Sequence, residues 1–122
     1  MALKTLIVDD AIMYRVLLRE FLDILGHPVV GEAQSGAEAL DLYRSLRPDL
    51  VTLDISLPDM DGIEVLRRLR ELDPGARVVI ISGNDQDSIV AEARRLGALA
   101  HLVKPVQLPQ LTELLTRLEK PS

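Results

Sequence analysis

Five short apolar segments, rich in leucine and β-branched residues, alternate along the chain with five segments whose apolar residues recur at helical spacing. The apolar segments cover residues 3–8, 29–33, 50–53, 77–82 and 98–103, and the helical segments cover residues 12–25, 36–46, 63–72, 86–96 and 108–118. Most apolar segments are nearly continuous rather than alternating, which is typical of strands covered on both faces. The strict alternation predicts an α/β fold: a doubly wound parallel five-stranded sheet of five βα units with right-handed crossovers.

The apolar side chains of the helical segments predict which face each helix buries. The expected buried residues are Ile12, Val16, Phe21, Ile24 and Leu25 in the first helix, Ala37, Leu40 and Tyr43 in the second, and Val65, Leu66 and Leu69 in the third. Gly26 and Gly97 are expected to end the first and fourth helices. His27, in the turn after the first helix, is expected to be exposed and without a role.

The chain has 122 residues, no cysteine and a formal net charge of -5. This length predicts one domain over residues 1–122, which can fold around a core without a disulfide or metal. The absence of cysteine excludes a disulfide framework, a thiolate metal site and a cysteine nucleophile. The acidic charge argues against direct nucleic-acid binding. No apolar run reaches the ~18 residues of a membrane span and no signal peptide opens the chain, so we expect a cytoplasmic protein without a membrane partner.

Charged and polar side chains stand at the ends of four predicted strands. Asp9 and Asp10 follow the first strand, and Asp54 follows the third. Ser82 ends the fourth strand, and Lys104 follows the fifth. Ligands of open doubly wound sheets bind outside the carboxyl ends of the strands. We therefore expect these five side chains to converge on one crevice.

The chemistry of this set is coherent. Three carboxylates held close together repel one another, so one of them becomes neutral unless a cation intervenes. Carboxylate oxygens favour a hard divalent ion, and Mg²⁺ fits best because it keeps waters that a phosphate can replace. With the ammonium of Lys104 and the hydroxyl of Ser82, the set can form an aspartyl phosphate. Taken singly, each residue also has a structural interpretation, and Asp10 could cap the first helix.

Four motifs, in this order and at this spacing, resemble those of response-regulator receiver domains, the CheY-like family. They are Ile-Val-Asp-Asp at 7–10, Pro-Asp-Leu-Val-Thr-Leu-Asp-Ile-Ser-Leu-Pro-Asp-Met-Asp-Gly at 48–62, Ile-Ser-Gly at 81–83 and Gly-Ala-Leu-Ala-His-Leu-Val-Lys-Pro at 97–105. The resemblance covers essentially the whole chain. It implies a flavodoxin-like sheet with strand order 2-1-3-4-5.

The resemblance also implies a metal site and an acceptor. Asp54 matches the phospho-acceptor and contributes to the binding of Mg²⁺ or Mn²⁺. Asp10 matches the direct metal ligand, Asp9 its partner through water, and the backbone carbonyl of Ser56 the third protein ligand. Ser56 and Asn84 also match the two variable positions that flank the attacking water. No organic cofactor is implied.

Two further roles follow from the resemblance, with one departure from the family pattern. Ser82 matches the switch hydroxyl, and Lys104 matches the amine that pairs with the phosphoryl group. The peptide bond between Lys104 and Pro105 is cis in the family. His101 stands where the family usually has Tyr or Phe, the side chain that reports the switch by changing rotamer. A histidine can make the same movement, although a half-exposed strand residue without a role is the alternative.

The resemblance implies a signalling protein rather than an enzyme, since a receiver catalyses only its own phosphorylation and dephosphorylation. The donor is expected to be a histidine kinase or a histidine phosphotransfer protein. The switched surface, made by segments 86–96, 98–103 and 108–118, is expected to bind a downstream effector protein, with a chemotaxis-like output as one option. A monomer or weak dimer is expected.

Other functions are compatible with parts of this sequence pattern. The chain could be a receiver excised from a larger regulator with a DNA-binding or enzymatic output domain, or a protein-binding module that works without phosphorylation. A phosphatase of the haloacid dehalogenase type needs a second acid where this chain has Ser56. A flavin carrier needs a Ser/Thr/Gly-rich loop after the first strand and stacking aromatics, but the loop reads Asp-Asp-Ala and aromatic residues make up 2% of the chain.

Overall fold

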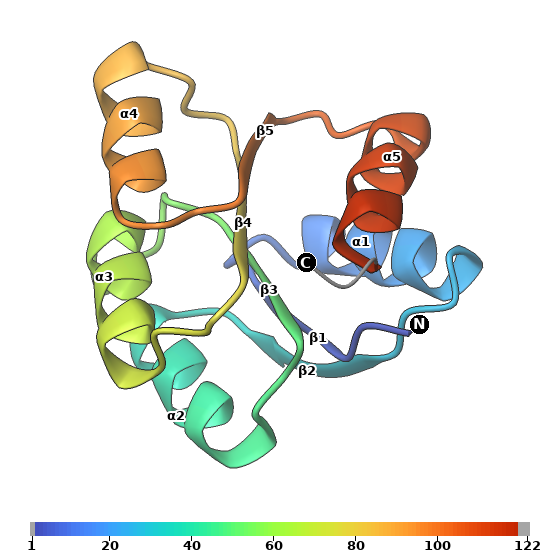
Figure 1. Cartoon of the computed structure of the whole chain (residues 1–122), viewed down its shortest axis with the longest axis horizontal. Helices are drawn as coiled ribbons and strands as arrows, with labels where there is room; N and C mark the ends of the chain where they lie inside the picture. The colour runs from blue at the N-terminus through green and yellow to red at the C-terminus, as the bar shows by residue number, and fades with distance from the viewer. Residues whose placement is uncertain (1, 120–122) are drawn as a thin grey trace.

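A computed structural model describes residues 2–119, so both ends of the predicted domain, Met1 and residues 120–122, lie outside the described residues. Five strands alternate with five helices (Figure 1). The strands are β1 (Thr5–Val8), β2 (Val29–Ala33), β3 (Leu50–Leu53), β4 (Val78–Ser82) and β5 (Ala100–Val103), and the helices are α1 (Ile12–Ile24), α2 (Gly36–Leu46), α3 (Gly62–Leu72), α4 (Asp87–Arg95) and α5 (Leu108–Glu119). Within residues 2–119, no helix has the length and apolar character to cross a membrane.

The five strands form one parallel sheet in the order β2-β1-β3-β4-β5, which confirms the predicted fold and strand order. Helices α1 and α5 cover one face, and α2, α3 and α4 cover the other (Figure 1). The three inner strands β1, β3 and β4 are buried along their whole length, as their continuous apolar sequences predict. The edge strands β2 and β5 are only partly buried. Strand β3 therefore lies at the centre of the sheet, with β1 and β4 beside it.

The predicted buried face of α1 is wrong at three positions. Ile12, Val16 and Ile24 expose 64%, 46% and 67% of their surface. Leu18 and Leu22 are buried instead, and the other apolar residues that pack against the core from this helix and its cap are Tyr14, Phe21 and Leu25. This helix has apolar side chains on more than one side, so periodicity alone did not show which side the sheet would cover.

The other helices agree better with the sequence. In α2, Leu40 and Tyr43 are buried, but Ala37 is exposed in the first turn, where Ser35 caps the helix by accepting a hydrogen bond from the Glu38 backbone N–H. The predicted face of α3 is buried as expected, at Val65, Leu66 and Leu69. Both Gly26 and Gly97 follow helices in the left-handed region, with φ of 81° and 101°, which favours glycine.

His27 is buried, contrary to the expectation of an exposed turn residue, with 2% of its surface accessible. Its Nδ1 accepts a hydrogen bond of 2.9 Å from the Leu3 backbone N–H, and its Nε2 lies 2.9 Å from Glu119 Oε1. The imidazole thus connects the segment before β1 with the end of α5. The local sequence did not indicate that His27 is buried, because both of its partners lie far from it in sequence.

Gly62, the first residue of α3, lies directly against the backbone of the loop after β3. A Cβ atom there would lie 2.3 Å from Ile55 Cα and 2.8 Å from the Asp54 carbonyl oxygen. The Gly62 backbone N–H also donates to the Ile55 carbonyl oxygen at 2.8 Å. This contact fixes the loop that follows β3.

We therefore expect Gly62→Ala to lower the free energy of unfolding by about 3 kcal/mol, because backbone atoms cannot rotate out of the way. Gly83→Ala is the matched control: a Cβ at Gly83 meets nothing within 4 Å, so its effect should stay within about 0.5 kcal/mol. Urea unfolding of both variants measures the difference. Equal stability of the two variants would show that the close approach at Gly62 is absent in solution.

Candidate functional site

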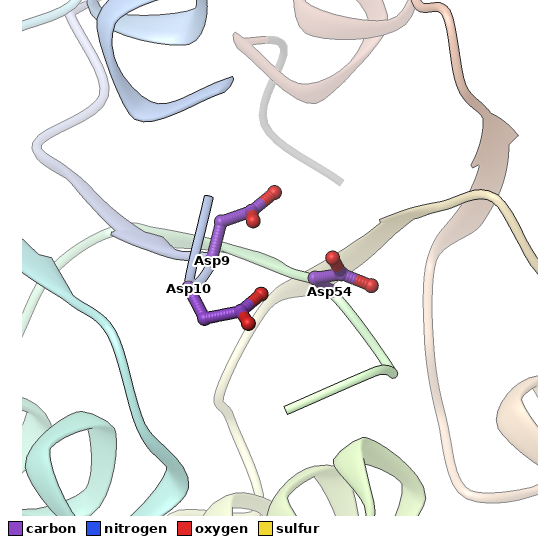
Figure 2. Close-up of side chains that lie close together, drawn as sticks. All are labelled: Asp9, Asp10 and Asp54. Carbon is purple, nitrogen blue, oxygen red and sulfur yellow. The ribbon is translucent and has the colours of Figure 1, made fainter. Parts of the chain in front are cut away.

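The predicted site residues gather at the carboxyl edge of the sheet. Asp9 and Asp10 follow β1, Asp54 follows β3, Ser82 ends β4 and Lys104 follows β5. One carboxylate oxygen from each of the three aspartates lies within 4.8 Å of the others. Figure 2 shows the three carboxylates gathered in this region. Because parallel strands end at the same edge, four distant segments of sequence supply one cluster.

The two aspartates after β1 have different surroundings. Asp9 is 1% exposed, and its Oδ1 accepts a hydrogen bond of 2.9 Å from the Ala11 backbone N–H. Asp10 is exposed, and among residues 2–119 its side chain makes no hydrogen bond or ion pair. Ala11, not Asp10, is the N-cap of α1, so the interpretation of Asp10 as a cap is wrong. Its carboxylate remains free for a ligand.

Asp54 is held between a backbone donor and an ammonium group. It is 5% exposed, and its Oδ1 accepts a hydrogen bond of 3.0 Å from the Ser56 backbone N–H. Ser56 in turn forms an antiparallel bridge with Asp61, which caps α3 by accepting from the Ile63 backbone N–H. The start of α3 therefore positions the loop that carries both the Asp54 carboxylate and the Ser56 carbonyl.

Asp59, in the same loop, is a positioning residue that the sequence did not single out. Its two carboxylate oxygens accept hydrogen bonds from the backbone N–H groups of Gly36 and Ala37, at 2.7 and 3.0 Å. These amides hold the pKa of Asp59 below its usual range. The side chain thus ties the loop after β3 to the N-terminus of α2, where a negative charge is favourable.

Lys104 joins two of the acids. Its Nζ donates to Asp9 Oδ2 at 2.8 Å and to Asp54 Oδ2 at 2.9 Å. Burial opposes the charge of this ammonium, but the hydrogen bonds and the charges of the two carboxylates outweigh burial, so the pKa of Lys104 is raised. The Lys104–Pro105 peptide bond is cis. One ammonium group thus contacts two buried carboxylates.

Ser82, Asn84 and His101 connect the site to the outer strand β5. Ser82 is fully buried, and its Oγ accepts a hydrogen bond of 3.3 Å from the Asn84 backbone N–H. His101 Nε2 lies 2.9 Å from the Asn84 carbonyl oxygen and so donates to it. His101 Nδ1 is buried and has no hydrogen-bond partner within residues 2–119. The half-buried imidazole therefore contacts the loop that follows Ser82.

The donor set fits a hard divalent cation. Three carboxylates face a single ammonium, so the cluster carries more negative than positive charge. Oxygen donors without sulfur or imidazole suit Mg²⁺ or Mn²⁺. Asp10 offers an uncommitted carboxylate. The set therefore has the donor chemistry that an octahedral, partly hydrated ion requires.

A comparison with models of known protein families places the chain in one of them. The family model of the response regulator receiver domain matches residues 5–116. The chain belongs to this family, whose members are phospho-accepting signalling domains of two-component systems.

The chain is similar to three proteins that illustrate the family. It is 38% identical over 120 residues to the chemotaxis protein CheY of Thermotoga maritima, an alignment that covers 98% of this chain and 100% of that protein. It is 39% identical over 110 residues to sporulation initiation phosphotransferase F of Bacillus subtilis, with 90% and 88% covered. A chain in the crystal structure of the CheX-CheY-BeF₃-Mg²⁺ complex from Borrelia burgdorferi superimposes with a TM-score of 0.92 at 31% identity, covering 97% of this chain and 90% of that one.

Proposed function

We propose that this chain is a Mg²⁺-dependent receiver whose Asp54 accepts a phosphoryl group from a phosphohistidine of a kinase or phosphotransfer protein. The observation that carries the proposal is the double contact of Lys104, which holds a compact cation against Asp54 and Asp9 at the ligand-binding edge of the sheet. A structural ion pair needs only one acid. An ammonium between two buried acids, beside a third and exposed acid, is suited to a site that takes up further charge.

The transfer step follows from the placement of the side chains. A carboxylate oxygen of Asp54 forms the new bond to phosphorus as the phosphorus–nitrogen bond of the donor histidine breaks, and the electron pair of that bond stays with the imidazole. Lys104 donates to a phosphoryl oxygen as charge develops, and Ser82 supplies a hydroxyl donor from the neighbouring strand. Asp9, Asp10, Asp54 and the Ser56 carbonyl would hold Mg²⁺, which would supply charge neutralisation and orientation.

The switch that we propose runs from Ser82 to the outer face of the protein. The phosphoryl group adds about two negative charges, which draw the Ser82 hydroxyl and its loop inward. Asn84 belongs to that loop and contacts His101, so the loop and β5 move together. The face made by α4, β5 and α5 then shifts between two populations with different affinity for an effector protein. Val90, Ala93, Arg94, Ala98, Ala100 and His101 line a small pocket on this face.

Sequence similarity to CheY supports the proposal that residues 1–122 form one receiver domain of a cytoplasmic protein. It also supports the proposal that the protein signals by binding another protein. In the similar Borrelia burgdorferi structure, CheY is in complex with CheX, BeF₃ and Mg²⁺. We propose that this chain acts as a monomer or weak dimer on proteins, not on nucleic acid or membranes, and that it turns over only its own phosphoryl group. The alternatives are a receiver within a longer regulator and a binding module that is not phosphorylated.

The metal site is best tested at Asp10, because an exposed side chain without partners among residues 2–119 can be changed without disturbing the fold. We expect Asp10→Asn to weaken Mg²⁺ binding at least about tenfold, because loss of a hydrogen-bonding partner of a metal ligand already costs about tenfold or more. Titration calorimetry measures this affinity, and the rate of labelling by acetyl phosphate at low Mg²⁺ should fall in parallel. Asp23→Asn, an exposed aspartate near the other end of α1, is the control. Equal Mg²⁺ affinity of the two variants would contradict the proposed metal site.

A further inference from the structure

Tyr14, in the first turn of α1, lies against the amine of the site. The Nζ atom of Lys104 is 4.1 Å from the centroid of the Tyr14 ring, well within the range of a cation–π contact. Tyr14 is partly buried, and the Lys104 side chain is 18% exposed. Water is thus partly excluded from this contact, which makes the attraction stronger than at an exposed position.

The ring completes the surroundings of the ammonium group. A lysine ammonium has three N–H donors, and the carboxylates of Asp9 and Asp54 accept two hydrogen bonds from it. The face of the Tyr14 ring, which carries the negative part of the ring quadrupole, lies next to the same nitrogen. Lys104 is therefore held by two anions and one neutral surface.

The hydroxyl of Tyr14 connects the ring to the loop that follows Lys104. Its oxygen accepts a hydrogen bond of 3.0 Å from the Val106 backbone N–H, two residues after Lys104. Val106 is 4% exposed, so this N–H has a protein partner where water has little access. The same tyrosine therefore contacts both the ammonium and the backbone of the loop that carries it.

We propose that Tyr14 is a positioning residue that keeps the Lys104 ammonium beside Asp54 while its carboxylate partners are engaged elsewhere. The inference rests on the proposed function, because that function requires Asp9 and Asp54 to share their oxygens with a metal ion and a phosphoryl group. When these oxygens are shared, the hydrogen bonds to Lys104 weaken. The ring contact does not compete for any oxygen and stays in place.

A neutral ring suits this task better than a further acid would. A fourth carboxylate beside Lys104 would add to the repulsion that an incoming phosphoryl group meets from Asp9, Asp10 and Asp54. It would also bind the ammonium tightly and hold it away from the phosphoryl oxygens. The aromatic face attracts the cation without adding net charge to the site.

Two substitutions separate the ring from the hydroxyl. Tyr14→Phe keeps the ring over Lys104 and removes only the hydroxyl that accepts from Val106. Tyr14→Leu removes both. The first readout is the proton shift of the Lys104 Cε methylene, which a ring current from Tyr14 would move upfield. The chain has only three lysines, at positions 4, 104 and 120, so the resonance can be assigned from a Lys104→Arg spectrum.

The second readout is the rate of labelling by acetyl phosphate at saturating Mg²⁺. We expect the upfield shift in the wild type and in Tyr14→Phe, and its loss in Tyr14→Leu. We expect labelling of Tyr14→Phe within about twofold of wild type and labelling of Tyr14→Leu about fivefold to tenfold slower, the factor that a partly desolvated cation–π contact gives. A Tyr14→Leu protein that has lost its fold, as judged by circular dichroism, is replaced by Tyr14→Met for the same comparison.

Two results would overturn the inference: an ordinary Lys104 methylene shift in the wild type, or equal labelling rates for the phenylalanine and aliphatic variants. If the wild type itself is not labelled, the proposed function fails and the positioning role fails with it. The methylene shift still reports whether the ring contact exists, so the two failures are distinguishable.

Discussion

Asp54→Asn is expected to abolish labelling of the chain by acetyl phosphate or by a phosphohistidine donor, a loss of at least about 100-fold. An amide cannot supply the oxygen nucleophile that forms the acyl phosphate. Asp54 follows the central strand β3, with Asp9 and Asp10 after β1 on one side and Ser82 on β4 on the other. A phosphoryl group on Asp54 would therefore lie between the acids and the hydroxyl donor.

The fold of Asp54→Asn should persist, because the substitution removes one of several mutually repelling carboxylates and keeps the size of the side chain. Labelling is followed by incorporation of a radioactive phosphoryl group, with circular dichroism as the check on folding. The control is again Asp23→Asn, which should be labelled like the wild type. A folded Asp54→Asn protein that is labelled at the wild-type rate would place the acceptor elsewhere.

Lys104→Ala is expected to have two large effects, one on stability and one on phosphorylation. Asp9 and Asp54 are 1% and 5% exposed, and Lys104 is hydrogen-bonded to both. Its removal leaves two buried carboxylates without this counter-charge, so the free energy of unfolding without Mg²⁺ should fall by about 3 kcal/mol. Added Mg²⁺ should restore more stability to this variant than to the wild type, since an ion that binds only the folded chain replaces the missing charge.

Phosphorylation of Lys104→Ala should be slower by a factor of about 100, the usual cost of losing one donor to the developing charge. Urea unfolding with and without Mg²⁺ measures the first effect, and the time course of labelling measures the second. Lys4→Ala serves as the control, because Lys4 is exposed before β1, at the opposite edge of the sheet from the site. Labelling of Lys104→Ala within twofold of the wild type would remove Lys104 from the transfer step.

Much of this fold could be predicted from the sequence because each element carries a local signal. The inner strands are continuous apolar segments, and glycines mark the ends of two helices. The predicted and observed bounds of α2, residues 36–46, coincide. The three aspartates and Lys104 come together, and Ser82 ends the neighbouring strand β4, because the strand order brings the carboxyl ends of distant segments to one edge.

The features that the sequence did not reveal depend on contacts between distant segments. His27 is buried because Leu3 and Glu119 supply partners for both ring nitrogens. The buried face of α1 depends on which side the sheet covers, and an apolar surface around much of the helix does not specify that side. The sequence did not single out Tyr14 or Asp59, because Tyr14 contacts Lys104 and Asp59 contacts the first turn of α2, and both partners are distant in sequence. A tyrosine one turn after two site aspartates is a signal that could have directed attention to Tyr14.

We propose that the acid cluster uses Mg²⁺ to place one phosphoryl group on the chain, and the intact mass of the wild-type protein tests this most directly. The protein is incubated with acetyl phosphate, once with Mg²⁺ and once with a chelator, beside a receiver already known to be labelled under these conditions. We predict a gain of one phosphoryl group with Mg²⁺ and none with the chelator. No gain under conditions that label the control receiver, or an equal gain with the chelator, would contradict the account and favour a receiver fold that serves only to bind a partner.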